Sequence, residues 1–411
     1  MKRLIKAFIN TVYNLYSFVA GLFYGRSRKN IVIGSWGGMT FSDNSRFLYQ
    51  YLVQNKDSLG ISNVIWVTRD EKLNTKLNRA GYKSCLIGTK ESKKWHLKSK
   101  IHIICNMFDD SYSFKSDIDT RYSCGARKIQ LWHGVGIKAC GDLTNRAKKN
   151  GSLIRGFLKK HVAPLFSKGL WKKCYFVATS KENERIAIFD YGFKKKKIIS
   201  GIYPRLCYKP SLFEDEEAII TDIGKKRDNG KVILYLPTFR DADVGYVSPD
   251  DIDGFDDWLE KNNYLWIQKS HSISRNQHLN RHGKNFVQLP DWFDINILYD
   301  YIDMVISDYS SASSDAVFKN LITLEYCPDY DYYKNDDRGF VADFLDYHVF
   351  KPVFDSNKLF YEVDSRFNTA AGSIEKRLQV KEFLFGKKQM SMREFSETII
   401  GKKKKNLERK T

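Results

Sequence analysis

Short apolar segments that alternate with stretches of helical spacing restrict the fold of this chain more than any other feature. In the first half of the sequence, these apolar segments are 30–35, 63–67, 101–105, 128–132 and 175–179. Each has the length and apolar character of a strand that is buried on both faces. Because helical stretches separate them, they predict a parallel, doubly wound α/β sheet.

A second series of the same kind occupies the other half of the chain, with apolar segments at 232–236, 265–269, 286–289, 304–307 and 322–326. Between the two series lies the charged segment 211–230, which we expect to be a linker. A chain of 411 residues is too long for one comfortable core. We therefore expect an N-terminal unit at 29–210, a C-terminal unit at 231–400 and a basic tail at 401–411.

The segment 1–28 predicts an amphipathic helix. Its polar and small residues recur every three or four positions, at Lys6, Asn10, Asn14, Ser17 and Gly21. These interruptions argue against a membrane span. Basic residues flank the apolar stretch on both sides, which favours a helix lying on anionic lipid. The alternative is a helix buried against the protein's own domain or a partner.

The formal net charge of +20 indicates a polyanionic partner. Nucleic acid, an anionic membrane surface and a phosphorylated substrate all satisfy this requirement. The basic runs at Lys194–Lys197 and Lys402–Lys405 are more typical of solvated surface, and they lack interleaved aromatic residues. No nucleic-acid-binding motif is present, so we expect no nucleic-acid partner.

The cysteines and acidic residues give no sign of a metal site. The seven cysteines are scattered and form no Cys-x-x-Cys pair, which argues against a disulfide framework and fits a reducing cytoplasm. Four D-x-D triplets occur, at Asp117/Asp119, Asp241/Asp243, Asp251/Asp253 and Asp329/Asp331. A chain with this many acidic residues contains such triplets by chance, so we infer no metal and no cofactor.

A histidine follows the strand predicted at 128–132. His133 precedes the flexible Gly134, and a neutral imidazole there could take a proton from an attacking hydroxyl group. Lys138 could balance phosphate charge nearby. The alternative is that a lone histidine is structural. The loose dinucleotide fingerprint Gly134-x-Gly136-x-x-Ala139 is discounted, since no acidic residue follows about 20 positions later.

Three further strand ends carry groups suited to phosphate. Asp308-Tyr-Ser310-Ser311 joins a buried strand to a predicted helix, where backbone N–H groups and hydroxyls favour an anion, although the serines could simply cap the helix. Lys269 and His271 pair a cation with an imidazole, which suits a leaving phosphate. Thr238 and Arg240 add a hydroxyl and a guanidinium, although Arg240 could equally pair with a neighbouring aspartate.

Taken in order, these segments resemble the CDP-glycerol glycerophosphotransferase family, the teichoic-acid primases and polymerases of bacterial cell envelopes. The resemblance runs from about Lys29 to Ile400. The similar segments are Ser42-Asp43-Asn44, Leu131–Gly134, Tyr235–Arg240, Lys269–His271, Ile306–Ser311 and Arg338–Phe340.

The resemblance implies a GT-B-like fold, with two Rossmann-type domains and a cleft between them. It implies that a lipid-linked or glycan acceptor attacks the phosphorus next to glycerol in a CDP-alcohol and that CMP leaves. From the N-terminal helix we expect a peripheral enzyme on the cytoplasmic face of the membrane. The expected catalytic residues are His133 and His271. The expected donor-phosphate residues are Arg240, Thr238, Lys269, Ser310 and Ser311, with Lys138, Asp308 and Gly134 in support.

The chain departs from the family pattern at several positions. Val135 and Gly136 replace the usual Thr and Pro, and Ser272 replaces Pro after His271. These changes leave the polyol of the donor open between glycerol, ribitol and another alcohol. A glycosyltransferase that uses a nucleotide sugar on the same scaffold is the second hypothesis, since fold does not fix the donor. A nucleic-acid-binding protein is the third, and only the charge supports it.

Overall fold

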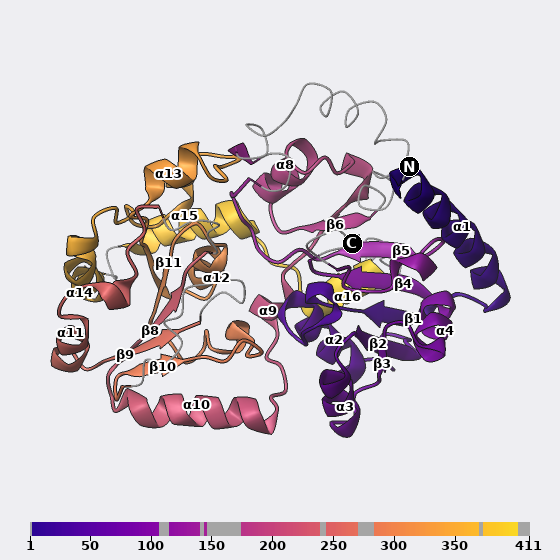
Figure 1. Ribbon diagram of the computed structural model, residues 1–411, viewed down its shortest axis with the longest axis horizontal. Helices are drawn as coiled ribbons and strands as arrows, with labels where there is room; N and C mark the ends of the chain where they lie inside the picture. Colours follow the sequence, from indigo (N-terminus) through magenta and orange to yellow (C-terminus); the bar gives the residue numbers. More distant parts are fainter. Residues whose placement is uncertain are drawn as a thin grey trace, which may run out of the picture.

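Two parallel β-sheets form the body of the protein (Figure 1). The computed structural model describes residues 2–106, 115–139, 144–145, 174–238, 244–269, 283–369 and 373–401. In this part of the chain the first sheet has the strand order β3-β2-β1-β4-β5-β6-β7, and the second has the order β10-β9-β8-β11-β12. Every strand pairs in parallel with its neighbours, as the α/β prediction requires.

The first sheet contains β1 (Ser27–Ile33), β2 (Asn63–Thr68), β3 (Ser84–Leu86), β4 (Ser99–Ile104), β5 (Arg127–Gln130), β6 (Tyr175–Ala178) and β7 (Ile198–Ser200). Its helices include α2 (Asp43–Gln54), α3 (Glu71–Arg79), α4 (Lys90–Lys98) and α8 (Lys181–Phe189). The central strand β1 is flanked by β2 and β4, and its residues Ile31, Val32 and Ile33 are fully buried. An apolar run without alternation is what burial on both faces demands.

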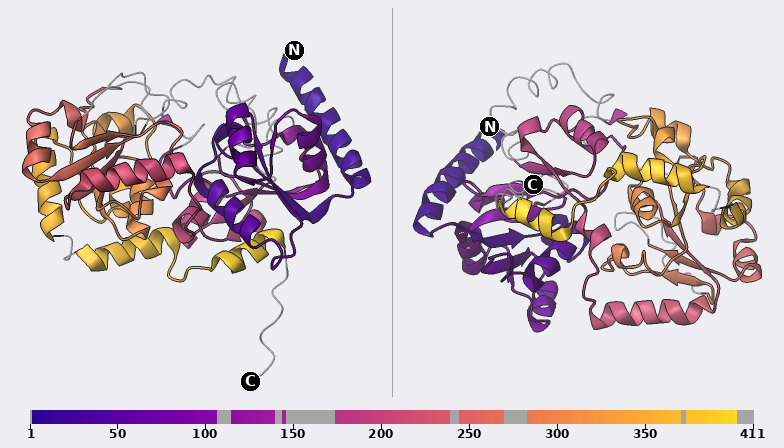
Figure 2. Two further views of the ribbon diagram at one scale, coloured as in Figure 1. Left: turned by 90° about the horizontal axis from the view of Figure 1, so that it is seen from below. Right: turned by 180° about the vertical axis from the view of Figure 1, so that it is seen from behind.

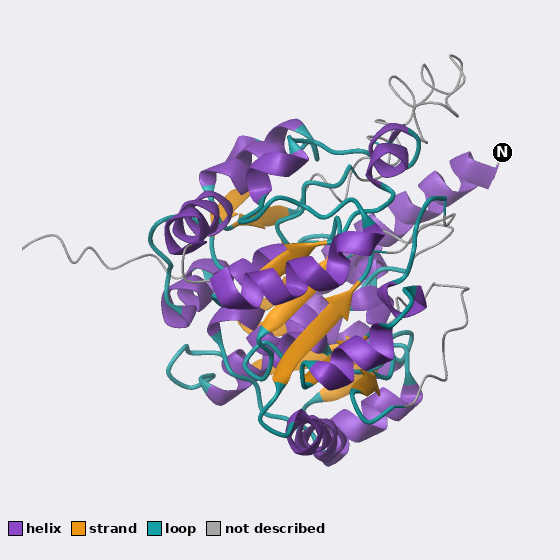
Figure 3. Cartoon of the chain, turned by 90° about the vertical axis from the view of Figure 1, so that its left-hand side faces the viewer, coloured by secondary structure: helices purple, strands orange, loops and turns teal. Residues whose placement is uncertain are grey.

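The second sheet contains β8 (Lys231–Leu236), β9 (Tyr264–Gln268), β10 (Phe286–Gln288), β11 (Met304–Ser307) and β12 (Ile322–Glu325). Around it lie α11 (Phe255–Lys261), α12 (Ala312–Phe318), α13 (Tyr330–Asn335), α14 (Leu359–Thr369) and α15 (Ile374–Phe385). Helices lie in front of and behind the strands (Figure 3). All strands predicted from the sequence are present, and the short edge strands β3 and β7 are additional.

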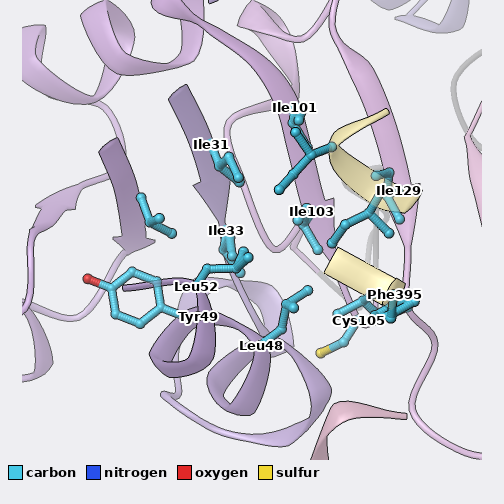
Figure 4. Packing of buried hydrophobic residues seen from close by; sticks show 14 of the residues in the cluster. Ile31, Ile33, Leu48, Tyr49, Leu52, Ile101, Ile103, Cys105, Ile129 and Phe395 are labelled. Atoms are coloured by element: carbon cyan, nitrogen blue, oxygen red, sulfur yellow. The ribbon is translucent and has the colours of Figure 1, made fainter. Parts of the chain in front are cut away.

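The last helix, α16 (Met392–Ile400), packs on the first sheet (Figure 2). Phe395 lies among the isoleucines of β1, β4 and β5, as Figure 4 shows. A Cβ atom added at Gly201 would lie 2.6 Å from the Phe395 ring, so this packing is tight. Although α16 lies within the expected C-terminal unit at 231–400, its apolar side chains therefore belong to the core of the first sheet. The apolar face of α16, with Met392, Phe395 and Ile399 in helical spacing, does not reveal which sheet it covers.

The segment 211–230, expected as a linker, is largely helical. It forms α10 (Glu214–Arg227), and its Ile223 belongs to the core of the second sheet. Acidic residues fill the first turn of α10 and basic residues fill its last turn, an arrangement that complements the helix dipole. At its start, Glu216 forms a bidentate ion pair with the buried Arg46 of α2, at 2.6 and 2.7 Å.

The N-terminal helix α1 (Lys2–Phe23) lies on the outside of the first sheet, as Figure 1 shows. Its small residues Ser17 and Gly21 are buried, and the Ser17 hydroxyl donates to the Cys124 carbonyl at 3.3 Å. Its large apolar side chains point outward: Leu15 is 67% exposed and Phe23 is 86% exposed. Only one edge of α1 is thus buried against its own domain. Within the described residues, the helices are too short or too polar to cross a bilayer.

Two buried histidines beneath α1 predict that the protein loses stability in mild acid. His96 donates to the Ser92 carbonyl at 2.7 Å and accepts from the Asp119 N–H at 3.1 Å, so it is neutral. Burial lowers the pKa of His96, and it lowers the pKa of the neighbouring His102 further. The unfolded chain, with histidine pKa values near 6.5, therefore takes up protons first as the pH falls.

The contribution of these histidines is complete above about pH 6.5 and is lost below it, at up to about 1.4 kcal/mol per pH unit for each group. Urea unfolding at pH 7.5, 6.5 and 5.5 measures this. We expect the free energy of unfolding to fall between pH 6.5 and pH 5.5. Equal values at pH 7.5 and pH 5.5 would contradict the assignment of both rings as neutral.

Candidate active site

His133 lies just beyond the carboxyl end of β5, in a loop whose backbone is unusual. Trp132 has a φ of 66° and Gly134 has a φ of 150°, both outside the regions that most residues prefer. The turn stacks the His133 ring on Trp132, with ring centroids 4.7 Å apart, and places it 5.5 Å from the Trp36 ring. Strained backbone held in a strand-end loop is typical of functional sites.

The contacts of the His133 ring prepare it to accept a proton. Its Nδ1 lies 3.4 Å from the carbonyl oxygen of Cys105. Because a carbonyl only accepts, Nδ1 carries the hydrogen and Nε2 keeps its lone pair. Burial lowers the pKa of His133 to about 4, which the Asp43 carboxylate opposes and the Arg205 guanidinium reinforces. The ring is therefore neutral at pH 7 and can act as a base.

Two polar side chains hold the backbone on either side of His133. The Asn44 amide donates to the Trp132 carbonyl at 2.9 Å, and the Arg205 guanidinium donates to the His133 carbonyl at 3.2 Å. Asn44 also accepts from the Arg205 N–H at 3.3 Å. Asn44 lies at the start of α2, whereas Arg205 lies in the short helix α9 (Pro204–Cys207). Together they fix the direction of the loop.

The second sheet contributes serines to the same loop. Ser311 directly precedes α12, and its hydroxyl lies 3.5 Å from the His133 carbonyl oxygen; the Ser314 hydroxyl donates to the Val135 carbonyl at 3.1 Å. A Cβ atom at Gly134 would lie 2.0 Å from the Ser311 hydroxyl oxygen. Glycine is thus needed at 134 for close approach as well as for its φ. The predicted His133–Gly134 and Ser310–Ser311 segments meet here.

A buried ion cluster lies beneath this meeting point. Arg205 donates from Nε and Nη2 to Asp315 Oδ2, at 3.1 and 2.6 Å, and from Nη1 to Asp43 Oδ1. All three side chains are almost fully buried. Burial raises the pKa of Asp315 to about 6, although Arg205 opposes the shift. Asp43 is the first residue of α2 and Asp315 lies in α12, so the cluster joins helices that accompany the two sheets.

Sequence reasoning did not identify Arg205 and Asp315 as part of the site, and it noted Asp43 only within the resemblance. Neither Arg205 nor Asp315 belongs to a segment with a chemical signature. Their roles come from contacts 110 residues apart along the chain. Charged side chains are rarely fully buried, so the sequence gives no reason to expect burial of Arg205 or Asp315.

Thr238, Asp308 and Lys138 also come together. Both carboxylate oxygens of Asp308 accept from the Thr238 N–H, at 3.0 and 2.9 Å, so Asp308 joins the ends of β8 and β11. The Lys138 ammonium donates to the Thr238 hydroxyl at 3.4 Å. Lys138 reaches this position because its backbone pairs with Phe340 in an antiparallel bridge. The loop after His133 is thereby tied to the R-G-F segment.

The remaining predicted residues either contact other groups or lie outside the described residues. Lys269, just beyond β9, donates to the Phe293 carbonyl, and burial lowers its pKa while Asp294 opposes the shift. Ser310 is half-buried, and its hydroxyl accepts from the Ala312 N–H at 3.4 Å, which is a capping contact. His271 and Arg240 lie outside the described residues.

Both aspartates of the first D-x-D triplet have structural contacts. Asp117, fully buried, accepts from the N–H groups of Gly37, Cys105 and Asn106 at 2.8, 3.0 and 2.8 Å, and so holds two strand ends together. Asp119 pairs with Arg121 at 2.8 Å. In the described ranges, no group of three or more His, Cys, Asp or Glu residues is placed to hold a metal ion.

Comparison with known proteins identifies the family. The sequence profile of the CDP-Glycerol:Poly(glycerophosphate) glycerophosphotransferase family matches residues 16–386. The chain belongs to the CDP-glycerol glycerophosphotransferase family. It is therefore a transferase of this class, as the resemblance implied. Its His133 loop and its Asp308–Ser311 segment both lie within the matched region of the family.

Similar curated proteins and a solved structure support the family assignment. The teichoic acid poly(glycerol phosphate) polymerase of Bacillus spizizenii is 27% identical over 342 residues, covering 81% of this chain and 82% of that protein. The teichoic acid glycerol-phosphate transferase of Staphylococcus aureus is 26% identical and covers 84% of each chain. A structure of the wall teichoic acid polymerase TagF superposes with a TM-score of 0.70 at 17% identity, over 98% of this chain and 99% of that one, which shows a shared GT-B-like fold.

Proposed function

We propose that this protein transfers glycerol phosphate, or a related polyol phosphate, from a CDP-alcohol to a hydroxyl group of a lipid-linked or glycan acceptor. CMP is the second product. The observation that carries the proposal is the position of His133: a neutral ring with a free Nε2 lone pair, whose backbone carbonyl contacts Ser311. A structure of a TagF variant soaked with CDPG shares this fold, with a TM-score of 0.68. The relatives named for glycerol phosphate favour glycerol as the polyol.

In the proposed reaction, His133 Nε2 takes the proton of the acceptor hydroxyl. The freed oxygen attacks the phosphorus next to glycerol, a new P–O bond forms, and the P–O bond to the CMP phosphate breaks. CMP leaves with the electron pair as an anion, so the step needs positive charge and hydrogen-bond donors rather than a strong acid. Lys138, Ser310 and Ser311 supply these groups. We further propose, from the sequence motifs, that the donor phosphates contact His271, Arg240, Lys269 and Thr238.

Product release distinguishes this function from the alternatives. Purified full-length protein is incubated with a lipid-linked acceptor and either CDP-glycerol, CDP-ribitol or UDP-sugars, and free nucleotide is quantified. We expect CMP from a CDP-alcohol and no UDP. Release of UDP alone would overturn the proposal and support the nucleotide-sugar glycosyltransferase.

We also propose that the protein works on the cytoplasmic face of the membrane, with α1 lying in the anionic lipid surface. The outward apolar face of α1 supports this, because such a helix buries its apolar side at the lipid boundary. Cations flank it: the Lys93 ammonium lies 4.8 Å from the Tyr16 ring centroid, and the Arg121 guanidinium lies 5.6 Å from that of Tyr13. Basic groups beside a helix at the lipid surface attract anionic lipid.

Charge placed on the apolar face of α1 is expected to release the protein from vesicles. The double variant Leu15→Glu/Leu22→Glu should lower partitioning onto phosphatidylglycerol vesicles more than tenfold in a sedimentation assay, since each buried leucine contributes about 1.5–3 kcal/mol. Phe189→Glu is the matched control, because Phe189 is 76% exposed on α8, away from α1. Unchanged partitioning of the double variant would contradict the membrane assignment.

A further inference from the structure

A small cavity lies between the loop that follows His133 and the Asp308–Ser311 segment. Its lining includes Gly136, Asp308, Ser310, Phe344 and His348. Its free volume is about 10 Å³, which is close to what one water molecule or one phosphate oxygen occupies. The cavity therefore borders both segments that the proposed reaction uses.

His348 is the histidine of this lining, and none of the roles above includes it. The side chain is buried, with 8% of the residue exposed, and its ring contacts Phe344 edge-on at 4.3 Å. Among the described residues, Nε2 has no hydrogen-bond partner. A buried polar atom without a hydrogen-bond partner costs about 1–3 kcal/mol of stability. Native proteins therefore usually retain such an atom only where water, an ion or a functional role accounts for it.

A carboxylate lies on the other side of the same ring. Glu325, at the end of β12, is 1% exposed, and its Oε1 lies 3.2 Å from His348 Nδ1. Burial alone would raise the pKa of Glu325, but His348 and Arg366 more than offset this, so the net shift is downward. Arg366 is itself held by the carbonyls of Thr323 and Lys351, at 3.0 and 2.8 Å. Among the described residues, neither Nδ1 nor Oε1 has a hydrogen-bond partner, so Glu325 acts on the ring as a close negative charge.

The geometry points to His348 as a donor-binding residue. We propose that His348 Nε2–H donates to a non-bridging phosphate oxygen of the CDP-alcohol in this cavity, beside Ser310, and that Glu325 orients the ring. A hydrogen bond from Nε2–H to an anionic phosphate oxygen would give this buried group a partner. Such a charge-assisted hydrogen bond is about twice as strong as a neutral one. The inference rests on the proposed function, because that function supplies the ligand.

Two substitutions separate this role from simple packing. In His348→Gln the amide nitrogen takes roughly the place of Nε2, whereas in His348→Asn it takes roughly the place of Nδ1. Calorimetric titration of the full-length protein with CDP-glycerol, without acceptor, gives the dissociation constants. We expect His348→Asn to weaken binding about tenfold, which corresponds to about 1.4 kcal/mol. We expect His348→Gln to stay within about threefold and Glu325→Gln to weaken binding in the same direction.

The controls keep the result decisive. Cytidine, which carries no phosphate, should bind all four proteins equally. Equal CDP-glycerol affinity in wild type and His348→Asn would overturn the inference and would mean that the cavity holds only water. If His348→Asn does not fold, Glu325→Gln decides the question by the same measurement. Absence of CDP-glycerol binding by the wild type would instead overturn the proposed function, and the inference with it.

Discussion

Replacement of His133 by alanine is expected to lower kcat by about 10²- to 10⁴-fold, while the dissociation constant for CDP-glycerol changes less than about threefold. The reason is that the ring would act on the acceptor hydroxyl, whereas the His133 backbone carbonyl, which contacts Arg205 and Ser311, remains in the variant. Initial rates of CMP release and calorimetric titration measure the two quantities. A variant that keeps a tenth of the wild-type kcat would remove His133 from the mechanism.

The pH dependence of the wild type gives a second reading of the same residue. Since burial lowers the pKa of His133 to about 4, the neutral, active form persists down to mildly acidic pH. The contribution of His133 to kcat/KM should therefore stay level from pH 8 to pH 5 and fall only as the pH approaches 4. An ordinary histidine would lose activity near pH 6.5. If kcat/KM halves near pH 6.5 because His133 becomes protonated, the lowered pKa of His133 is contradicted.

Replacement of Arg205 by methionine is expected to cost about 3–5 kcal/mol of stability, because it leaves two buried carboxylates without their cation. Those carboxylates belong to Asp43 and Asp315. The loss of the hydrogen bond to the His133 carbonyl should also lower kcat in the protein that remains folded. Urea unfolding measures the first effect. Arg205→Lys should recover part of the stability but not the two hydrogen bonds that Arg205 donates to Asp315 Oδ2.

Arg393→Met is the matched control for this experiment. Arg393 pairs with Glu397 at 3.3 Å on α16, with side-chain exposures of 57% and 35%. Exposed pairs contribute about 0–1 kcal/mol. Equal losses in the two variants, or a loss below about 1 kcal/mol for Arg205→Met, would show that the buried cluster does not stabilise the junction.

The sequence predicted the strands well because burial on both faces leaves an uninterrupted apolar run. β3 and β7 have three residues each, and so short a segment carries no periodicity. His133 could be placed at the carboxyl edge of the first sheet, and Thr238 and Ser311 at that of the second, since parallel strands bring their carboxyl ends together. Arg205 and Asp315 could not, because the distance between them in space depends on how the two sheets are joined.

The return of α16 to the first sheet has a consequence for how the chain folds during synthesis. Phe395 and Ile399 complete a core whose other members, such as Ile31 and Leu48, leave the ribosome hundreds of residues earlier. At about 5–20 residues per second, the first sheet waits tens of seconds for its last helix. Throughout that interval the core residues that contact Phe395 are uncovered, so the nascent N-terminal half is exposed to aggregation and to chaperones until α16 has been synthesised.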